Sequence, residues 1–145
     1  MATFDKVPVV IQAIEDDGYH LLCEVKIGRK KLIALIDTGA SKTVISESLL
    51  AKSKSISLSD TVAASAKGMG TEDLQPQVAI IKKLKIGKQS LSNLTVGVLG
   101  FSHIELVYQQ LGIKPFHLII GGDILVKLNA VINYNKSVMK LVIQE

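Results

Sequence analysis

The sequence predicts a single all-β domain, and three observations support this prediction. Apolar and polar residues alternate with a period of two in several segments, as they do in half-buried strands. Turn-forming residues separate these segments at distances that suit hairpins. The chain has 145 residues, of which 48% are hydrophobic and 21% charged, which excludes both disorder and a two-lobed enzyme. We therefore expect residues 1–145 to form one domain, so that a site built from two lobes would need a second copy.

The first third of the chain is expected to form three consecutive strands. Residues 7–14 are rich in Val and Ile, and the acidic turn at 15–18 leads into a second run at 19–27. Alternate residues of this second run form its apolar face: Tyr19, Leu21, Cys23, Val25 and Ile27. After a Gly-Arg-Lys turn, residues 31–36 form a buried strand that leads directly into Asp37.

Further strands are expected along the rest of the chain. Residues 44–45 read as a short strand, and residues 78–86 and 91–99 form a hairpin that is dense in Val, Ile and Leu. A final hairpin joins residues 130–134 to residues 137–143 through an Asn-Lys turn.

Three segments carry the signals of short helices. Ser46 is the expected cap of a helix that runs to residue 52. Ser102 and Glu105 fit a capping box, and the helix that follows ends near Leu111, before a glycine. Asp123 is placed to cap a third short segment.

A glycine-rich turn at residues 66–71 predicts an exposed hairpin tip. Gly68 and Gly70 flank Met69 between polar residues, which suits a mobile turn. This hairpin is a candidate lid. Met69 is either a contact for a ligand or simply an exposed turn residue.

The single cysteine, the three histidines and the first residues of the sequence lead us to expect a cytoplasmic protein without a cofactor. The single Cys23 cannot form an internal disulfide and reads as a small buried hydrophobe. The three histidines do not have the spacing of metal ligands. Residues 1–6 lack a secretory signal, and no apolar run approaches the roughly 18 residues of a membrane span. We expect a cytoplasmic location and no metal, cofactor or membrane partner.

The net charge is mildly basic. Lys and Arg number 17 and Asp and Glu number 13, which gives +4. The basic clusters at 29–31 and 82–85 lie near turns and lack interleaved aromatic residues, so we expect no nucleic-acid partner.

The segment Leu35-Ile36-Asp37-Thr38-Gly39-Ala40-Ser41 has the strongest chemical signal. It places a carboxylate immediately after a buried apolar strand, where it can act as an acid or a base. Thr38 can hydrogen-bond to a neighbouring backbone, Gly39 permits close backbone approach, and small Ala40 leaves room in a cleft.

These residues resemble the signature of the retropepsin-like aspartic proteases. The second signature of that family, two apolar residues and a glycine, is matched by Ile119, Ile120 and Gly121, 84 residues after Asp37. The hairpin sequence at 24–28 and the glycine-rich tip at 67–70 also occur in the expected order.

The resemblance implies a closed β-barrel, the single lobe of an acid protease, with a flap hairpin and one or two short helices. It implies a homodimer in which Asp37 of each subunit meets on the two-fold axis. The chain has one such motif, since Asp60 and Thr61 are followed by Val62. Thr38 would tie the two active loops together, and Ile119, Ile120 and Gly121 would lie beside them. The substrate-binding residues would be Gly39, Ala40, Gly68, Met69 and Gly70.

The function implied is an aspartic endopeptidase that hydrolyses peptide bonds in peptide or protein substrates. One shared proton on the two Asp37 carboxylates would let one act as acid while the other activates water. A non-catalytic dimeric module that binds peptides is the alternative, and a small nucleic-acid-binding β-domain is the weakest reading. The sequence departs from compact viral members at Ser41, at Gly122-Asp123 and in the helix after Ser102. Residues 138–143 are a hypothesis for the dimer sheet.

Overall fold

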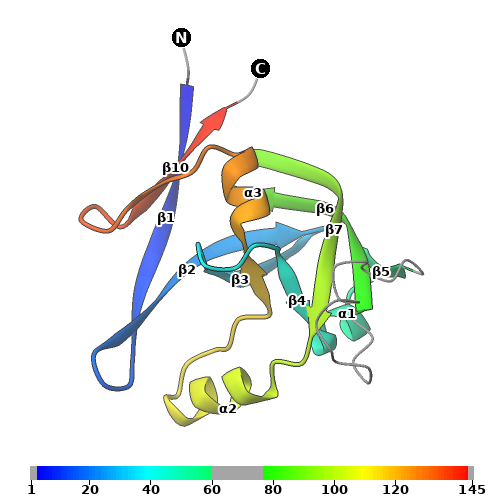
Figure 1. Cartoon of the computed structure of the whole chain (residues 1–145), viewed down its shortest axis with the longest axis horizontal. Helices are drawn as coiled ribbons and strands as arrows, with labels where there is room; N and C mark the ends of the chain where they lie inside the picture. The colour runs from blue at the N-terminus through cyan, green and yellow to red at the C-terminus, as the bar shows by residue number, and fades with distance from the viewer. Residues whose placement is uncertain (1–2, 60–76, 144–145) are drawn as a thin grey trace.

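The computed structural model of the chain describes residues 3–59 and 77–143, and these form a closed β-barrel with added strands (Figure 1). Ten strands occur in these residues: β1 (Thr3–Ile14), β2 (Gly18–Ile27), β3 (Lys30–Ile36), β4 (Val44–Ser46), β5 (Ile56–Ser59), β6 (Gln77–Ile86), β7 (Gln89–Leu99), β8 (Leu118–Ile120), β9 (Val131–Asn133) and β10 (Val138–Ile143). Six of them close a ring in the order β6, β7, β4, β8, β3 and β2, because β2 pairs again with β6. The expected closed barrel is confirmed.

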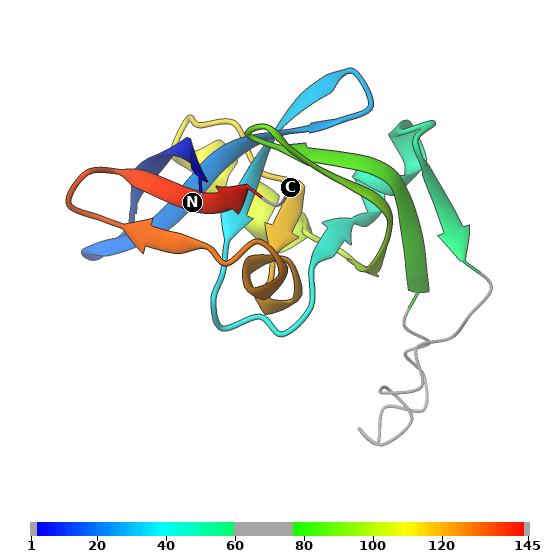
Figure 2. The same ribbon diagram turned by 90° about the horizontal axis from the view of Figure 1, so that it is seen from above.

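The remaining strands extend the ring on two sides. β5 pairs with β6, while β1 pairs with β2 through Val9–Ile14 and with β10 through Thr3–Pro8. Figure 2 shows β1, β10 and β9 on one side of the barrel and β5 on the other, with α3 between them. The first and last strands of the barrel extension, β1 and β10, are therefore joined by hydrogen bonds within the subunit. The role of residues 138–143 in a dimer sheet stays a prediction.

Two clusters of buried side chains stabilise the fold. The larger is aliphatic and fills the barrel with the inward residues of its strands, such as Val25, Ile45, Ile81 and Leu118. The smaller contains Leu22, Phe101, Tyr108 and Phe116, and lies where α2 and the segment after it cover the outer face of the barrel. This second cluster explains why Leu22 is buried on the face of β2 that alternation predicts to be polar. Tyr19, which was predicted on the apolar face, is 61% exposed because it lies close to the tip of the β1–β2 hairpin.

Three short helices occur in the described residues, at the three segments whose sequences carry helix signals, where the family resemblance implied one or two: α1 (Glu47–Lys52), α2 (Ser102–Gln110) and α3 (Gly122–Lys127). Ser46 caps α1 as predicted, since the amide of Leu49 donates to Ser46 Oγ over 3.0 Å.

The other two capping predictions are wrong. The cap of α2 is Phe101, without a side-chain bond, and Glu105 points instead to Ser48, whose hydroxyl donates to it over 3.4 Å. The cap of α3 is Gly121, because the carboxylate of Asp123 is engaged by a residue of another loop.

Candidate active site

Asp37 lies at the end of β3, next to the second signature. β3 and β8 are parallel neighbours, with Ile36 in register with Ile120. The amide of Asp37 donates to the carbonyl oxygen of Ile120 over 3.0 Å. The two segments singled out in the sequence are thus hydrogen-bonded to each other, and the strand pairing fixes the position of the Asp37 backbone.

A tight turn follows Asp37 and orients its carboxylate. The amide of Ala40 donates to the Asp37 carbonyl over 3.2 Å, and the amide of Gly39 donates to Asp37 Oδ1 over 2.9 Å. The other oxygen, Oδ2, has no hydrogen-bond partner within residues 3–59 and 77–143. Asp37 is half-buried, so this oxygen is available to a ligand.

Gly121 is required by the close crossing of two backbones. A Cβ at this position would lie 2.6 Å from the carbonyl carbon of Lys42 and 2.9 Å from the carbonyl oxygen of Ala40. The amide of Gly122 donates to the same Ala40 oxygen over 2.7 Å. The glycine of the second signature therefore lets the Asp37 loop lie directly against β8 and the start of α3.

Thr43 and Asp123 hold this crossing together. Thr43 is 0% exposed, and its hydroxyl donates to Asp123 Oδ1 over 2.8 Å while accepting from the Gly121 amide over 3.0 Å. The Thr43 amide donates to Asp123 Oδ2 over 3.1 Å. No sequence pattern points to Thr43, since its partners lie about 80 residues away in the chain.

Some of the other predicted site residues lie within the described part of the chain and some lie outside it. Thr38 and Gly39 are exposed and Ala40 is half-buried, whereas Ile120 and Gly121 are buried and Ile119 is half-buried. The predicted flap residues lie outside the described residues: Gly68, Met69 and Gly70.

His20 is a neighbour of Asp37 to which sequence reasoning assigned no role. Leu22 is in register with Leu35, and continuing this register places His20 beside Asp37. His20 Nδ1 lies 2.7 Å from the hydroxyl oxygen of Tyr108, and the two rings are stacked with centroids 5.7 Å apart. Burial lowers the pKa of His20, and the Asp37 carboxylate opposes part of that shift. Only the fold brings α2 to β2, so no local pattern could reveal this pair.

A second histidine links three elements away from Asp37. His117 Nδ1 lies 3.0 Å from Ser46 Oγ and 3.7 Å from Glu105 Oε1. Ser46 and Glu105 approach the same ring nitrogen, whereas a catalytic triad needs them on opposite nitrogens, so this cluster reads as a structural link between β4, α2 and the start of β8.

Other reactive side chains do not form a site in the described part of the chain. Among those residues, no group of three or more His, Cys, Asp and Glu side chains is placed to hold a metal ion. Cys23 is buried, and burial raises the pKa of its thiol to about 12, which makes it a poor nucleophile. Of the helices in this part of the chain, none has the length and apolar character of a membrane span.

Comparison with known proteins identifies the family. Residues 23–127 match the family described as "gag-polyprotein putative aspartyl protease". The chain belongs to this family. Both signatures and the Thr43–Asp123 pair lie inside the matched region, and the resemblance to retropepsin-like proteases is confirmed.

One solved structure supports the fold, and a second is reported beside it. The crystal structure of a retropepsin-like aspartic protease from Rickettsia conorii is similar with a TM-score of 0.52 and 17% identity, over 98% of this chain and 94% of that chain. The retroviral protease-like domain of Ddi1 from Leishmania major gives a TM-score of 0.48 and 13% identity, over 87% of this chain and 95% of that chain. No curated protein matches the chain.

Proposed function

We propose that this protein is an aspartic endopeptidase that acts as a homodimer, with one Asp37 from each subunit. The observation that carries the proposal is the state of Asp37: one carboxylate oxygen is oriented by the Gly39 amide and the other is unpaired within the described residues. The surrounding loop is locked to the second signature through Thr43 and Gly121. A carboxylate that is rigidly positioned and still accessible suits acid–base chemistry.

The need for a second carboxylate supports the dimer. The chain contains one Asp-Thr-Gly, and Asp123 is occupied by three hydrogen bonds inside its own subunit. A two-fold axis beside Asp37 would bring in the second carboxylate by symmetry. Thr38, which is exposed in the subunit, would then meet its copy and tie the two loops together.

In this dimer the two Asp37 carboxylates share one proton, because two negative charges a few ångströms apart repel strongly. The ionised carboxylate removes a proton from a water molecule, which attacks the carbonyl carbon of the peptide bond. The protonated carboxylate donates to the carbonyl oxygen, and a tetrahedral intermediate forms. Transfer of a proton to the amide nitrogen then breaks the C–N bond.

The substrate in this proposal is an extended peptide. Gly39 and Ala40 would contact its backbone on the floor of the cleft, and Gly68, Met69 and Gly70 would cover it from the flap. Main-chain contacts of this kind bind many sequences, whereas side-chain pockets decide which bond is cut.

The test is cleavage of an unfolded protein mixture between acidic and neutral pH by the natural chain, by Asp37→Asn and by Asp16→Asn. Asp16 is an exposed turn residue and serves as a matched control. We expect cleavage that is strongest on the acid side, a loss of at least about 10²-fold in Asp37→Asn, and no loss in Asp16→Asn. Sedimentation of all three proteins checks that they are folded dimers.

Two outcomes would contradict the proposal. Equal cleavage by Asp37→Asn and the natural chain would point to a contaminating protease or another site. No cleavage by folded dimers of the natural chain would favour the alternative, a dimeric module that binds peptides without cutting them. Specific activity that falls on dilution supports an obligate dimer.

A further inference from the structure

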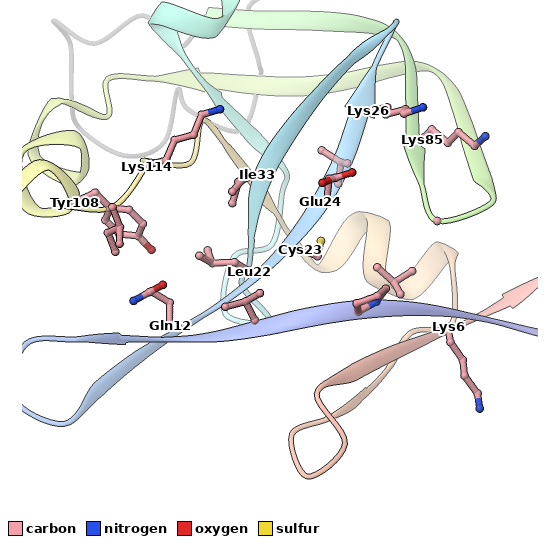
Figure 3. A pocket seen from close by; sticks show the side chains of 16 residues that line it. Lys6, Gln12, Leu22, Cys23, Glu24, Lys26, Ile33, Lys85, Tyr108 and Lys114 are labelled. Carbon is pink, nitrogen blue, oxygen red and sulfur yellow. The ribbon is translucent and has the colours of Figure 1, made fainter. Parts of the chain in front are cut away.

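A groove of about 670 Å³ lies on the outer face of the barrel, away from the Asp37 loop. Its walls come from β1, β2, β3, the β6–β7 turn and the segment around Tyr108 and Lys114 (Figure 3). None of residues 37–43 lines it. The groove is therefore distinct from the candidate active site.

The floor of the groove is apolar. Side chains from three strands, from α2 and from the segment after α2 form it: Val10, Leu22, Ile33, Tyr108 and Ile113. Val10 is 57% exposed, so core packing does not require an apolar side chain at this position. An apolar floor of this kind favours a ligand with apolar groups of its own.

The rim of the groove is positively charged. Lys6, Lys26, Lys85 and Lys114 line it, and Glu24 is its one acidic residue. Figure 3 shows Lys6, Lys26 and Lys85 around one end and Lys114 near Tyr108 at the other. Within the described residues these four lysines form no salt bridge, and Glu24 has its own partner, with Lys31 Nζ 3.9 Å from its carboxylate.

The sheet register places several of these lysines directly opposite other lysines. Lys26 pairs with Lys31 on β3 and with Lys85 on β6, and Lys6 pairs with Lys140 on β10. Like charges in opposite positions of neighbouring strands destabilise a sheet. The fold thus carries an electrostatic cost at the rim that bound carboxylates would remove.

We propose that this groove binds an extended acidic peptide segment that carries apolar side chains. The lysines would receive the carboxylates, and the floor would receive the apolar side chains. Lys6, Pro8, Val10 and Gln12 line the groove at every second residue of β1. This stretch is about 20 Å long, which is the length of an extended peptide of about six residues. The proposal does not depend on the proteolytic function.

Fluorescence anisotropy with defined peptides tests this binding. The probe is a fluorescein-labelled ten-residue peptide of alternating Glu and Leu, with Lys-Leu and Glu-Ser peptides of equal length for comparison. The protein is the full chain with Asp37→Asn, so that cleavage cannot interfere. We expect the Glu-Leu peptide to bind at least about tenfold more tightly than either comparison peptide, and its affinity to fall with added salt.

Matched variants locate the site. Lys26→Gln with Lys85→Gln should weaken binding at least about fivefold, and Val10→Ser about threefold. The controls lie outside the groove: Lys54→Gln with Lys136→Gln, and Val131→Ser, which should change affinity less than about twofold. Without the peptide, the Lys26→Gln and Lys85→Gln protein should unfold at a higher temperature, because the opposed charges are gone.

Three results would overturn the proposal. Equal binding of the Glu-Leu and Glu-Ser peptides would mean that the apolar floor takes no part. Unchanged affinity in the lysine variant would place the peptide elsewhere. Binding to vesicles of anionic lipid without binding to the Glu-Leu peptide would identify a membrane surface, instead of a peptide, as the partner.

Discussion

The segments that follow β3 and β8 each carry an aspartate, Asp37 in a turn and Asp123 in the first turn of α3, and the two aspartates have opposite surroundings. Asp37 accepts one hydrogen bond, from the Gly39 amide, and keeps Oδ2 unpaired within the described residues. Asp123 accepts three, from the amide and hydroxyl of Thr43 and from the amide of Ile124. The same type of side chain is thus accessible for chemistry after β3 and fully used for structure after β8.

This difference indicates that the two signatures have separate roles in the candidate site. The first loop supplies the reactive group and stays partly exposed, whereas the second supplies a rigid support. A change in the supporting segment should reduce stability first and activity as a consequence. A change at Asp37 should reduce activity and leave stability nearly unchanged. The following substitutions separate these effects, starting with the largest expected change in stability.

Replacing Gly121 with Ala should be the most damaging change. Its Cβ would lie within 3.0 Å of three backbone atoms of Ala40 and Lys42, which cannot move without opening the crossing of the loops. We expect a loss of more than about 3 kcal/mol in the free energy of unfolding. Gly122→Ala is the control, because the nearest atom to its Cβ is 3.5 Å away, and it should cost less than about 1 kcal/mol. Urea unfolding of both variants measures these losses, and equal losses for Gly121→Ala and Gly122→Ala would contradict the prediction.

Thr43→Val should rank second. Valine has the shape of threonine but leaves the Gly121 amide without its acceptor, and it removes one of the two hydrogen bonds to Asp123 Oδ1. The expected loss is about 2 kcal/mol. Thr43→Ser keeps the hydroxyl and should lose about 1 kcal/mol through the missing methyl group. If valine proves as stable as the natural chain, the hydrogen bonds do not hold the crossing.

The two aspartates can be compared directly by replacing each with Asn. Asp123→Asn retains one acceptor oxygen but turns an amide group toward a donor of Thr43, and should lose about 1 kcal/mol of stability. Asp37→Asn should stay within about 0.5 kcal/mol of the natural chain, because Gly39 can still donate to an amide oxygen. Chemical denaturation measures both, and the comparison fails if Asp37→Asn is the less stable of the two.

The smallest effect concerns the pH dependence of stability through His117. Burial lowers the pKa of His117, Glu105 raises it, and Lys52, Lys30 and Lys114 lower it further. The unfolded chain therefore binds a proton more readily, so stability falls as the pH decreases through about 6.5 and levels off below the lower pKa of the folded state. The His117→Asn protein should lose less stability between pH 7.5 and 5.5 than the natural chain.

The control for this measurement is His103→Asn, since His103 is exposed on α2. Its pH dependence should match that of the natural chain. Identical pH profiles for the natural chain and His117→Asn would show that protonation of His117 is not linked to folding.

Sequence patterns predict the features of the candidate site that are local in the chain. Residue type and order single out residues 35–41 and 119–121, and the alternation of apolar and polar residues predicts the strands. Thr43 and the His20–Tyr108 pair were missed, because their partners come from distant segments. The capping box at Ser102 failed for the same reason: Glu105 has a long-range partner that a local rule does not include.

The strand pairing also sets the order of events during synthesis. The Asp37 loop is held by β8, whose Ile120 lies 84 residues after Ile36, and β1 is held by β10, whose Ile143 lies 140 residues after Thr3. Pairings this distant form slowly and only after both strands exist. A nascent chain on the ribosome therefore carries Asp37 in an unlocked loop until residues 118–120 have emerged. The topology delays any activity of this loop until β8 has left the ribosome, without a separate inhibitor.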